Sequence, residues 1–143
     1  MKSIRILVAL ALALAAAGAF AQNANRGGTI YESATRAATV TSGDIANDVY
    51  RGIHLIVDVT TAPGGDTITP KIQGKDLTSG KYYDILVGAA ISSTGTNVLK
   101  VYPGIGASAN AAANDFLPRV WRVVVTHSAG TNFVYSVGYN ADY

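Results

Sequence analysis

The chain of 143 residues contains no cysteine, one methionine and one tryptophan. The absence of cysteine excludes disulfide bonds, thiolate metal sites, catalysis by a thiol and lipid attachment to a lipoprotein cysteine. The fold must therefore be stabilised by a packed core alone. A chain of this length fits one domain of ordinary size, which can bury enough apolar surface to fold without cross-links.

Long apolar runs are absent after residue 21, and the run before it is too short to cross a bilayer. Lys2 and Arg5 give the chain a positive start, an uncharged apolar stretch follows, and Ala19-Phe20-Ala21 is the small-x-small pattern that signal peptidase cuts. The stretch is shorter than the ~20 residues of a transmembrane helix. We therefore predict that residues 1–21 form a helical signal peptide cleaved before Gln22. The protein is then exported to the periplasm or the extracellular medium, with no membrane contact afterwards.

Charged side chains are also scarce, at 14% of residues, with 11 Lys and Arg against 9 Asp and Glu. Two of the basic residues, Lys2 and Arg5, belong to the predicted signal, so the chain from Gln22 has equal numbers of each sign. The remaining basic residues stand singly along the sequence and form no patch that would bind phosphates. The composition therefore predicts no nucleic-acid partner.

From Tyr50 onward, apolar residues recur at every second position. Apolar residues alternate with polar ones in blocks separated by glycine-rich turns, which is typical of strands with one buried face. In the first block, one face carries Ile53, Leu55, Val57 and Val59, and the other carries His54, Ile56 and Asp58. Further strands are expected at 67–73, 81–89, 98–102, 120–127 and 132–139, with weaker ones at 29–32 and 38–41.

This pattern predicts an all-β domain, an antiparallel β-sandwich that is jelly-roll-like and has about eight short strands. The sandwich spans 29–143 and follows a signal helix and a flexible arm over 22–28. Within it, Trp121 and Val123 should face the core, away from Arg122.

The turns predict how some strands are connected. Pro63-Gly64-Gly65-Asp66 and the segment 128–131 each resemble a hairpin turn, so each should join two strands that pair with one another. Pro70 cannot donate a backbone hydrogen bond, which favours an edge position or a bulge. The segment 107–115 has neither alternation nor a helical stripe, and we interpret it as a long connection between sheets, with at most one helical turn.

Residues suited to catalysis are few. His54 and His127 are the only histidines, and both fall within predicted strands. A triad of Ser128, His127 and Asp58 is disfavoured because adjacent strand residues point to opposite faces. A small hydrolase using His54 or His127 is the weakest of the hypotheses, and we predict no catalytic residue and no enzymatic activity.

Metal and cofactor sites are likewise not indicated. Asp66, Asp76 and Asp84 lie near turns without the spacing of a calcium loop or another metal motif. Gly104-Ile105-Gly106 does not complete a phosphate-binding sequence. We therefore predict no metal and no cofactor.

The aromatic residues allow two interpretations. Phe133, Tyr135 and Tyr139 lie on one face of the last predicted strand, where they can form part of the core with hydroxyls at its rim. Part of the aromatic surface can instead contact a sugar or a neighbouring subunit, because rigid amphipathic rings give contact area at low entropic cost. The candidate interface or ligand residues are Tyr82, Tyr139 and Tyr143.

Taken in order, the segments from Tyr50 to Gly138 resemble a group of small structural proteins of tailed-phage virions. The resemblance is carried by YRG running into HLIVDVT, then TPKIQGKD, SGKYYDIL, AISSTGTNVLKVYPGIGA, AAANDFLPRVWRVVVTH and FVYSVG. It implies a non-enzymatic, β-rich virion component, often of the decoration or head-attached type, that acts by repeated assembly. Virion proteins of this kind usually start directly at a segment like TIYES, whereas this chain has an export signal before it.

Two hypotheses for function follow. The first is a structural or assembly protein, similar to a phage decoration protein, that self-associates as a homo-oligomer or binds a protein lattice of a virion or cell surface. The second is a secreted bacterial carbohydrate-binding or adhesion module, which requires an exposed coplanar aromatic pair such as Tyr82 with Tyr139. The first hypothesis allows a location in the virion, and the export signal predicts the periplasm or the extracellular medium.

Overall fold

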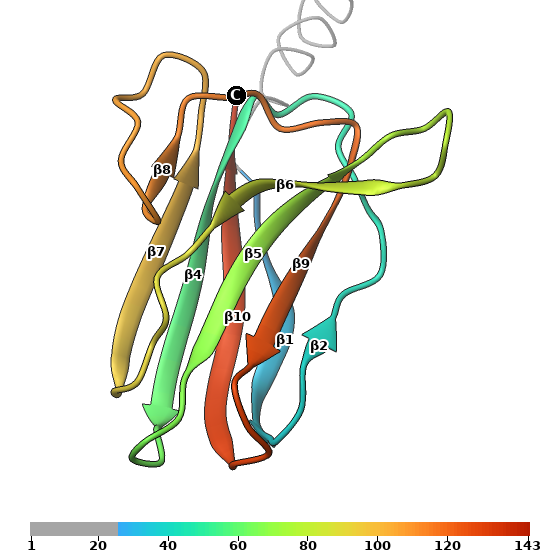
Figure 1. The fold of residues 1–143 in the computed structure, drawn as a ribbon. Helices are drawn as coiled ribbons and strands as arrows, with labels where there is room; N and C mark the ends of the chain where they lie inside the picture. The colour runs from blue at the N-terminus through green and yellow to red at the C-terminus, as the bar shows by residue number, and fades with distance from the viewer. Residues whose placement is uncertain (1–25) are drawn as a thin grey trace, which may run out of the picture.

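The computed structural model describes residues 26–143, which form ten β-strands and no helix (Figure 1). The predicted signal peptide, its cleavage site and residues 22–25 of the predicted arm lie outside the described residues. The strands are β1 (Arg26–Arg36), β2 (Val40–Thr41), β3 (Ile45–Ala46), β4 (Gly52–Thr61), β5 (Ile68–Lys75), β6 (Tyr82–Val87), β7 (Gly95–Val101), β8 (Ala112–Ala113), β9 (Val120–His127) and β10 (Phe133–Asp142). Within this range no helix is available that could span a membrane.

The strands form two sheets that pack face to face. The first sheet has the order β1-β10-β4-β7-β8, and the second has the order β2-β9-β5-β6, with β3 also paired to β9. All pairs are antiparallel except β7 with β8. If β2 and β3 are counted as one interrupted strand and the short β8 is set aside, four strands lie in each sheet in the order of a jelly roll. The predicted fold class is therefore confirmed.

The core lies between the sheets and is made by the alternate residues that the period of two selects. Trp121 is 2% exposed, and Ile53, Leu55, Val57, Phe133 and Tyr135 are fully buried. The inward residues of the first sheet include Ile53, Leu55, Val57, Val59, Leu99, Val101, Phe133, Tyr135 and Val137, and those of the second include Ile68, Ile72, Leu86, Trp121, Val123 and Val125. Burial of this apolar surface is the main force that holds the sheets together.

The two predicted hairpins are wrong. β4 pairs with β10 and β7, whereas β5 pairs with β9 and β6, so the link after Thr61 crosses from one sheet to the other. The segment 128–131 likewise carries the chain from β9 in the second sheet to β10 in the first. A glycine-rich turn signals a reversal of direction, but it does not determine whether the next strand pairs beside the previous one or packs against it about 10 Å away.

Pro70 was expected at an edge position or a bulge. It lies in β5, which is flanked by β9 and β6 and is not an edge strand, and the β5–β6 pairing has an irregularity nearby, between Ile72 and Gln73. The carbonyl of Pro70 accepts a hydrogen bond from the amide of Gly88 at 2.8 Å, just beyond the end of β6. In an antiparallel ladder, the backbone nitrogen and the carbonyl of one residue face the same neighbouring strand. The nitrogen of Pro70 therefore faces the β6 side, where regular pairing with β6 has ended, and its missing N–H breaks no ladder hydrogen bond.

Two further expectations differ from the structure in detail. The segment 107–115 does lead from the first sheet to the second, as predicted, but it includes the short strand β8 instead of a helical turn. Arg26, Gly27 and Gly28 were expected in the flexible arm, yet they belong to β1 and pair with residues 139–141 of β10. Glycine, which favours loops, is accommodated here because Gly28 leaves room for the ring of Tyr139.

The ends of the sandwich differ in the loops they carry (Figure 1). We call the end at which β10 finishes, at the top of Figure 1, the upper end. The links 47–51, 76–81 and 102–119 lie there, together with Tyr143 and the start of β1. The other end, the lower end, carries the links 37–39, 62–67, 88–94 and 128–132.

Candidate interaction surface

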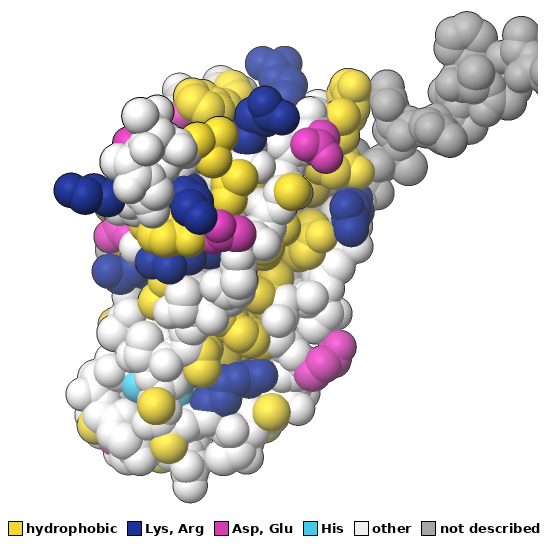
Figure 2. All heavy atoms as spheres, turned by 90° about the vertical axis from the view of Figure 1, so that its right-hand side faces the viewer, with side chains coloured by type: hydrophobic (Ala, Val, Ile, Leu, Met, Phe, Trp, Pro, Cys, Tyr) yellow, Lys and Arg dark blue, Asp and Glu magenta, His cyan; other side chains and the backbone are white. Residues whose placement is uncertain are grey.

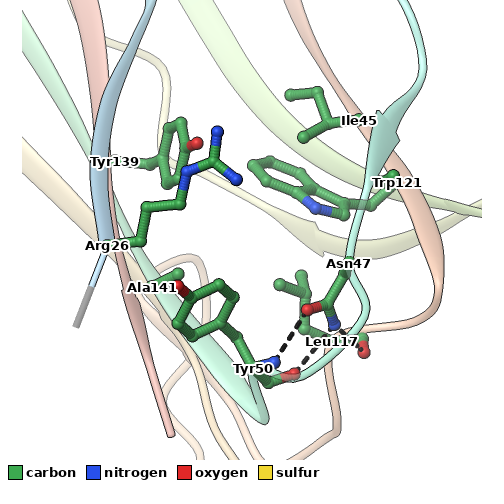
Figure 3. Close-up of a pocket in the computed structure, with 9 residues that line it drawn as sticks. Arg26, Ile45, Asn47, Tyr50, Leu117, Trp121, Tyr139 and Ala141 are labelled. Atoms are coloured by element: carbon green, nitrogen blue, oxygen red, sulfur yellow. Dashed lines mark hydrogen bonds between the residues drawn. The ribbon is translucent and has the colours of Figure 1, made fainter. Parts of the chain in front are cut away.

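The backbone of the upper end is held by the side chain of Asn47, which is 6% exposed (Figure 3). Its amide nitrogen Nδ2 donates to the carbonyls of Tyr50 at 2.8 Å and Leu117 at 2.9 Å, and its Oδ1 accepts from the amide of Tyr50 at 2.9 Å. The two bonds with Tyr50 lie within the β3–β4 link, and the bond to Leu117 joins that link to a loop segment that no sheet ladder connects to it. Asn47 therefore fixes the β3–β4 link against the link that precedes β9.

Further backbone hydrogen bonds extend this connection to the C-terminus. The amide of Leu117 donates to the carbonyl of Arg51 at 2.8 Å, and the amide of Arg51 donates to the carbonyl of Asp142 at 2.9 Å. The hydroxyl of Tyr102 donates to the carbonyl of Tyr143 at 2.9 Å. Three parts of the chain that are distant in sequence thus form one connected surface.

Large apolar side chains are exposed on this surface. Val49 is 52% exposed, Phe116 is 61% exposed and Tyr143 is 48% exposed, each on one of the three connected segments. Tyr83, at 45%, lies near the start of β6 at the same end. We call these four side chains the upper surface.

Tyr83 lies beside the link that precedes β9, next to Pro118. A Cβ atom added to Gly74 would lie 2.5 Å from Cζ of Tyr83 and 2.9 Å from Cγ of Pro118, so the tyrosine ring and the proline ring lie side by side over this glycine. Pro118 is two residues from Phe116. Pro118 is itself buried, so Tyr83 packs beside the link that carries Phe116, but Pro118 adds no exposed apolar area between the two.

Exposed charges of both signs surround the upper surface. Asp48 and Arg51 flank Val49, while Asp115 and Arg119 flank Phe116. Within residues 26–143 the ion pairs join only Lys71 with Asp84 and Lys75 with Asp44, so these four charges are unpaired there. Asp142 beside Tyr143, Arg26 at the start of β1, and Asp76 and Lys81 on the link 76–81 are exposed and, within the same range, unpaired at the same end, so the two signs are balanced over these segments.

Beneath the upper surface, Trp121 and Tyr139 pack edge to face with ring centres 5.6 Å apart and planes at 82°. Arg26 reaches toward these rings (Figure 3). The void that these residues line with Asn47 and Tyr50 has a volume of about 10 Å³, which is at most the size of one water. It is a packing gap and not a ligand pocket.

Tyr82, a predicted candidate, lies on the outer face of the second sheet. Its ring is covered by Arg122, whose guanidinium carbon is 3.3 Å from the ring centre, and its hydroxyl donates to Asp44 at 2.5 Å. Lys75 also donates to Asp44 at 2.5 Å, and its ammonium lies 5.4 Å from the ring centre. Tyr82 is therefore occupied by contacts within the chain.

The three predicted aromatic residues are not brought together as a platform. Tyr139 faces the space between the sheets against Trp121, whereas Tyr82 lies on the opposite side of the second sheet under Arg122. The coplanar pair of Tyr82 and Tyr139 that a sugar-binding surface would need is thus not assembled. Of the three residues, Tyr143 alone belongs to the upper surface.

His127 lies at the lower end between the sheets. Its Nε2 is 3.2 Å from the hydroxyl of Tyr135, and its ring meets Phe133 edge to face at 5.7 Å. Burial, and to a smaller degree the nearby cation of Arg36, lowers the pKa of His127 below its usual 6.5. Burial raises the pKa of Tyr135 to about 12. These groups pack the lower core as neutral partners.

The disfavoured triad is not assembled. The hydroxyl oxygen of Ser128 accepts from the amide of Thr67 at 2.9 Å, and Asp58 accepts from the hydroxyl of Thr96 at 3.0 Å on the outer face of the first sheet. His54 also points outward, beside a shallow groove of about 280 Å³ that Asn140 and Asp142 help to line.

The three turn aspartates lie apart. Asp76 accepts hydrogen bonds from Ser79 at 2.5 Å and from the amide of Thr78 at 2.9 Å, and these contacts lower its pKa, with that of Ser79 the largest. Asp84 accepts from Gln73 at 2.6 Å. In the stretch from Arg26 to Tyr143, no three potential ligands among His, Cys, Asp and Glu gather as a metal site would require.

A second apolar surface runs along one side of the sandwich, between β1 and the edge of the second sheet (Figure 2). An open groove of about 320 Å³ on this side is lined by Ile30, Ile45 and Tyr139, with the link 42–44 at its rim. Ile30 and Ile45 are only partly buried against the core. The edges of the two sheets therefore do not close completely on this side.

Val49 and Phe116 were not predicted as interface residues, because they lie outside the predicted strands. Both follow an Asn-Asp pair and precede a second apolar residue, in Asn47-Asp48-Val49-Tyr50 and Asn114-Asp115-Phe116-Leu117. In each case the first apolar side chain is exposed, while the second is more buried. A large apolar residue isolated in a polar loop was the available signal.

Comparisons with known proteins place the chain in no family. No protein-family model and no curated protein matches it. Two solved structures of infectious bursal disease virus are similar in part. The Gx strain structure has a TM-score of 0.47 and 11% identity and covers 82% of this chain and 31% of that chain. The Gt strain structure has a TM-score of 0.46 and 12% identity and covers 82% of this chain and 32% of that chain. The chain thus spans about a third of the length of those chains.

Proposed function

We propose that this chain is a non-enzymatic structural protein that acts by self-association or by binding a protein lattice, similar to decoration-type proteins of tailed-phage virions. The observation that carries the proposal is the upper surface, where Val49, Tyr83, Phe116 and Tyr143 are 45–61% exposed on segments tied together by hydrogen bonds. Four large apolar side chains exposed at one end of the sandwich, on or beside loops that are joined to one another, favour the binding of a partner there.

The rigidity of the surface supports a role in binding. Hydrogen bonds of Asn47, Leu117 and Arg51 connect the backbone of the loops that carry the exposed side chains before any partner arrives. A preformed surface loses little conformational entropy when it binds, so more of the contact energy appears as affinity. A polar rim around an apolar centre is also the usual anatomy of a protein interface.

Several groups that could perform chemistry have structural partners. His127 packs against Tyr135 and Phe133, Ser128 accepts from Thr67, and Asp44 binds Lys75 and Tyr82. The resemblance from Tyr50 to Gly138 covers strands β4 to β9 and most of β10. An assembly role accounts for both the resemblance and the exposed upper surface.

The location of the protein in its native host distinguishes a virion component from an exported bacterial protein. In the native host, we would separate particles by density gradient from the periplasm, the medium and the cytoplasm, and quantify the chain by mass spectrometry. The proposal expects it to co-sediment with protein particles in a fixed ratio to their main subunit. A free protein in the periplasm or medium that binds members of a glycan array would contradict it and favour the carbohydrate-binding hypothesis.

A further inference from the structure

We infer that the upper surface is the contact between two copies of this chain, joined end to end about a two-fold axis. This inference rests on the proposed function, because it names the surface by which self-association occurs. The area of the surface, its charge and the difference between the two ends of the sandwich support it.

The exposed apolar area matches that of a protein dimer. Val49, Tyr83, Phe116 and Tyr143 are 52%, 45%, 61% and 48% exposed. With roughly 150–250 Å² for a whole large side chain, they leave on the order of 400 Å² of apolar surface. A stable interface buries about 800 Å² on each partner, of which somewhat more than half is apolar. The upper surface therefore supplies most of the apolar area that one partner must contribute.

The charges around the surface suit a copy of itself. A two-fold axis sets each face against its own duplicate, so a face with a net charge would repel its partner. Asp48, Arg51, Asp115 and Arg119 comprise two charges of each sign, all exposed and without ion pairs inside the described chain. Rotation about the axis can place the arginines of one copy beside the aspartates of the other.

The lower end offers no complementary apolar surface. Of the six exposed large apolar side chains, the four of the upper surface and Leu77 lie at the upper end, while Val98 lies on β7. The lower links consist mostly of glycine, alanine, serine and threonine. A head-to-tail contact would cover Phe116 with small polar residues, whereas a two-fold contact covers it with aromatic and aliphatic side chains. The asymmetry therefore favours like ends meeting.

The test is the oligomeric state in solution, measured by sedimentation equilibrium on the full chain and on the chain that begins at Gln22. Phe116→Glu and Val49→Glu each place a carboxylate at the centre of the contact, where the two-fold axis duplicates it. Val98→Glu is the matched control, because Val98 is 38% exposed on the outer face of β7. Circular dichroism and Trp121 fluorescence establish that each variant is folded.

We expect the wild type and Val98→Glu to form dimers with the same dissociation constant, and the two upper-surface variants to raise that constant more than tenfold. A wild-type monomer at about 1 mM would overturn the inference. So would dimers that Phe116→Glu and Val49→Glu leave intact. A full chain that is monomeric, when only the shortened chain dimerises, would overturn the second copy as occupant and assign the surface to residues 1–21.

The two proposals fail in different ways. A monomer that still co-sediments with particles would overturn the end-to-end dimer and leave the structural role standing. A dimer that never associates with particles would support the contact and contradict the structural role.

Discussion

Arg122 stacks on Tyr82, with its guanidinium carbon 3.3 Å from the ring centre, on the outer face of the second sheet. The Nε of Arg122 also donates to Gln73 at 2.8 Å, and the hydroxyl of Tyr82 donates to Asp44. These contacts fasten the link between β2 and β3 to the β5–β6 hairpin. Cation–π and charge-assisted contacts of this kind hold a surface in place more than they stabilise the whole fold.

The carboxylate of Asp44 should make stability depend on acid pH. Hydrogen bonds from Lys75 and then Tyr82 lower the pKa of Asp44 below 3.8 in the folded protein. Its contribution to stability is therefore present above pH 3.8 and is lost as the pH falls through the folded pKa. We expect Asp44→Asn to unfold at lower urea than the wild type at pH 7, and the difference to shrink below pH 4. A difference that stays constant down to pH 3 would contradict this assignment, and Tyr82→Phe tests the contribution of the hydroxyl alone.

His127 should make the stability of the fold depend on pH in a second range, which begins nearer neutral pH. Its folded pKa lies below the unfolded value near 6.5, mainly because of burial, so the unfolded chain takes up a proton first as the pH falls. Stability is thus complete above pH 6.5 and decreases as the pH drops toward the folded pKa. Thermal melts from pH 8 to pH 5 should show a steeper loss for the wild type than for His127→Gln. His54→Gln, on the outer face, should follow the wild type; equal slopes in all three proteins would refute the assignment.

Trp121 should be the most costly side chain to truncate. It is 2% exposed and packs edge to face on Tyr139, so Trp121→Ala leaves a cavity between the sheets. The expected loss is roughly 3–5 kcal/mol, a large part of the ~5–15 kcal/mol that stabilises a typical domain. Urea denaturation followed by circular dichroism measures it, with Val98→Ala as the exposed control. A loss under about 1 kcal/mol would show that the indole site collapses without penalty.

Gly52 should tolerate no side chain. An added Cβ would lie 2.5 Å from the carbonyl oxygen of Val101 and would also overlap the ring of Tyr102. Because the carbonyl belongs to the neighbouring strand, it cannot move aside as a flexible side chain could. We expect Gly52→Ala to cost about 1–3 kcal/mol, the range for overpacking. Gly64→Ala, which has no atom within 4 Å of the added Cβ, should stay within about 0.5 kcal/mol of the wild type when both are melted in parallel.

Much of the fold could be predicted because a strand with one buried face alternates apolar and polar residues over a short stretch of sequence. The alternation in β4 identified Ile53, Leu55, Val57 and Val59 as core residues, and Trp121 was assigned to the core in the same way. Strand β9 was predicted with its observed bounds. Each of these features depends on a period that a short window of sequence contains.

Pairing partners and the candidate surface could not be predicted in this way. Whether the strand after Pro63 pairs with β4 or faces it depends on β10, which lies far along the chain. Val49 and Phe116 become a surface only because Asn47 and Arg51 bring their loops together. Arg122 on β9 covers the ring of Tyr82 on β6, with β5 between the two strands. The sequence next to Tyr82 therefore does not indicate that its ring is covered.

The jelly-roll path has a kinetic consequence. Every connection between its principal strands changes sheet, except the hairpin from β5 to β6. Neither sheet can be completed until nearly the whole chain is present, since β1 must wait for β10 and β2 for β9. Contacts between such distant segments slow the search for the native state, and we expect folding in milliseconds to seconds with little structure gained before the last strand arrives. A ribosome would thus release this chain almost whole before it could fold.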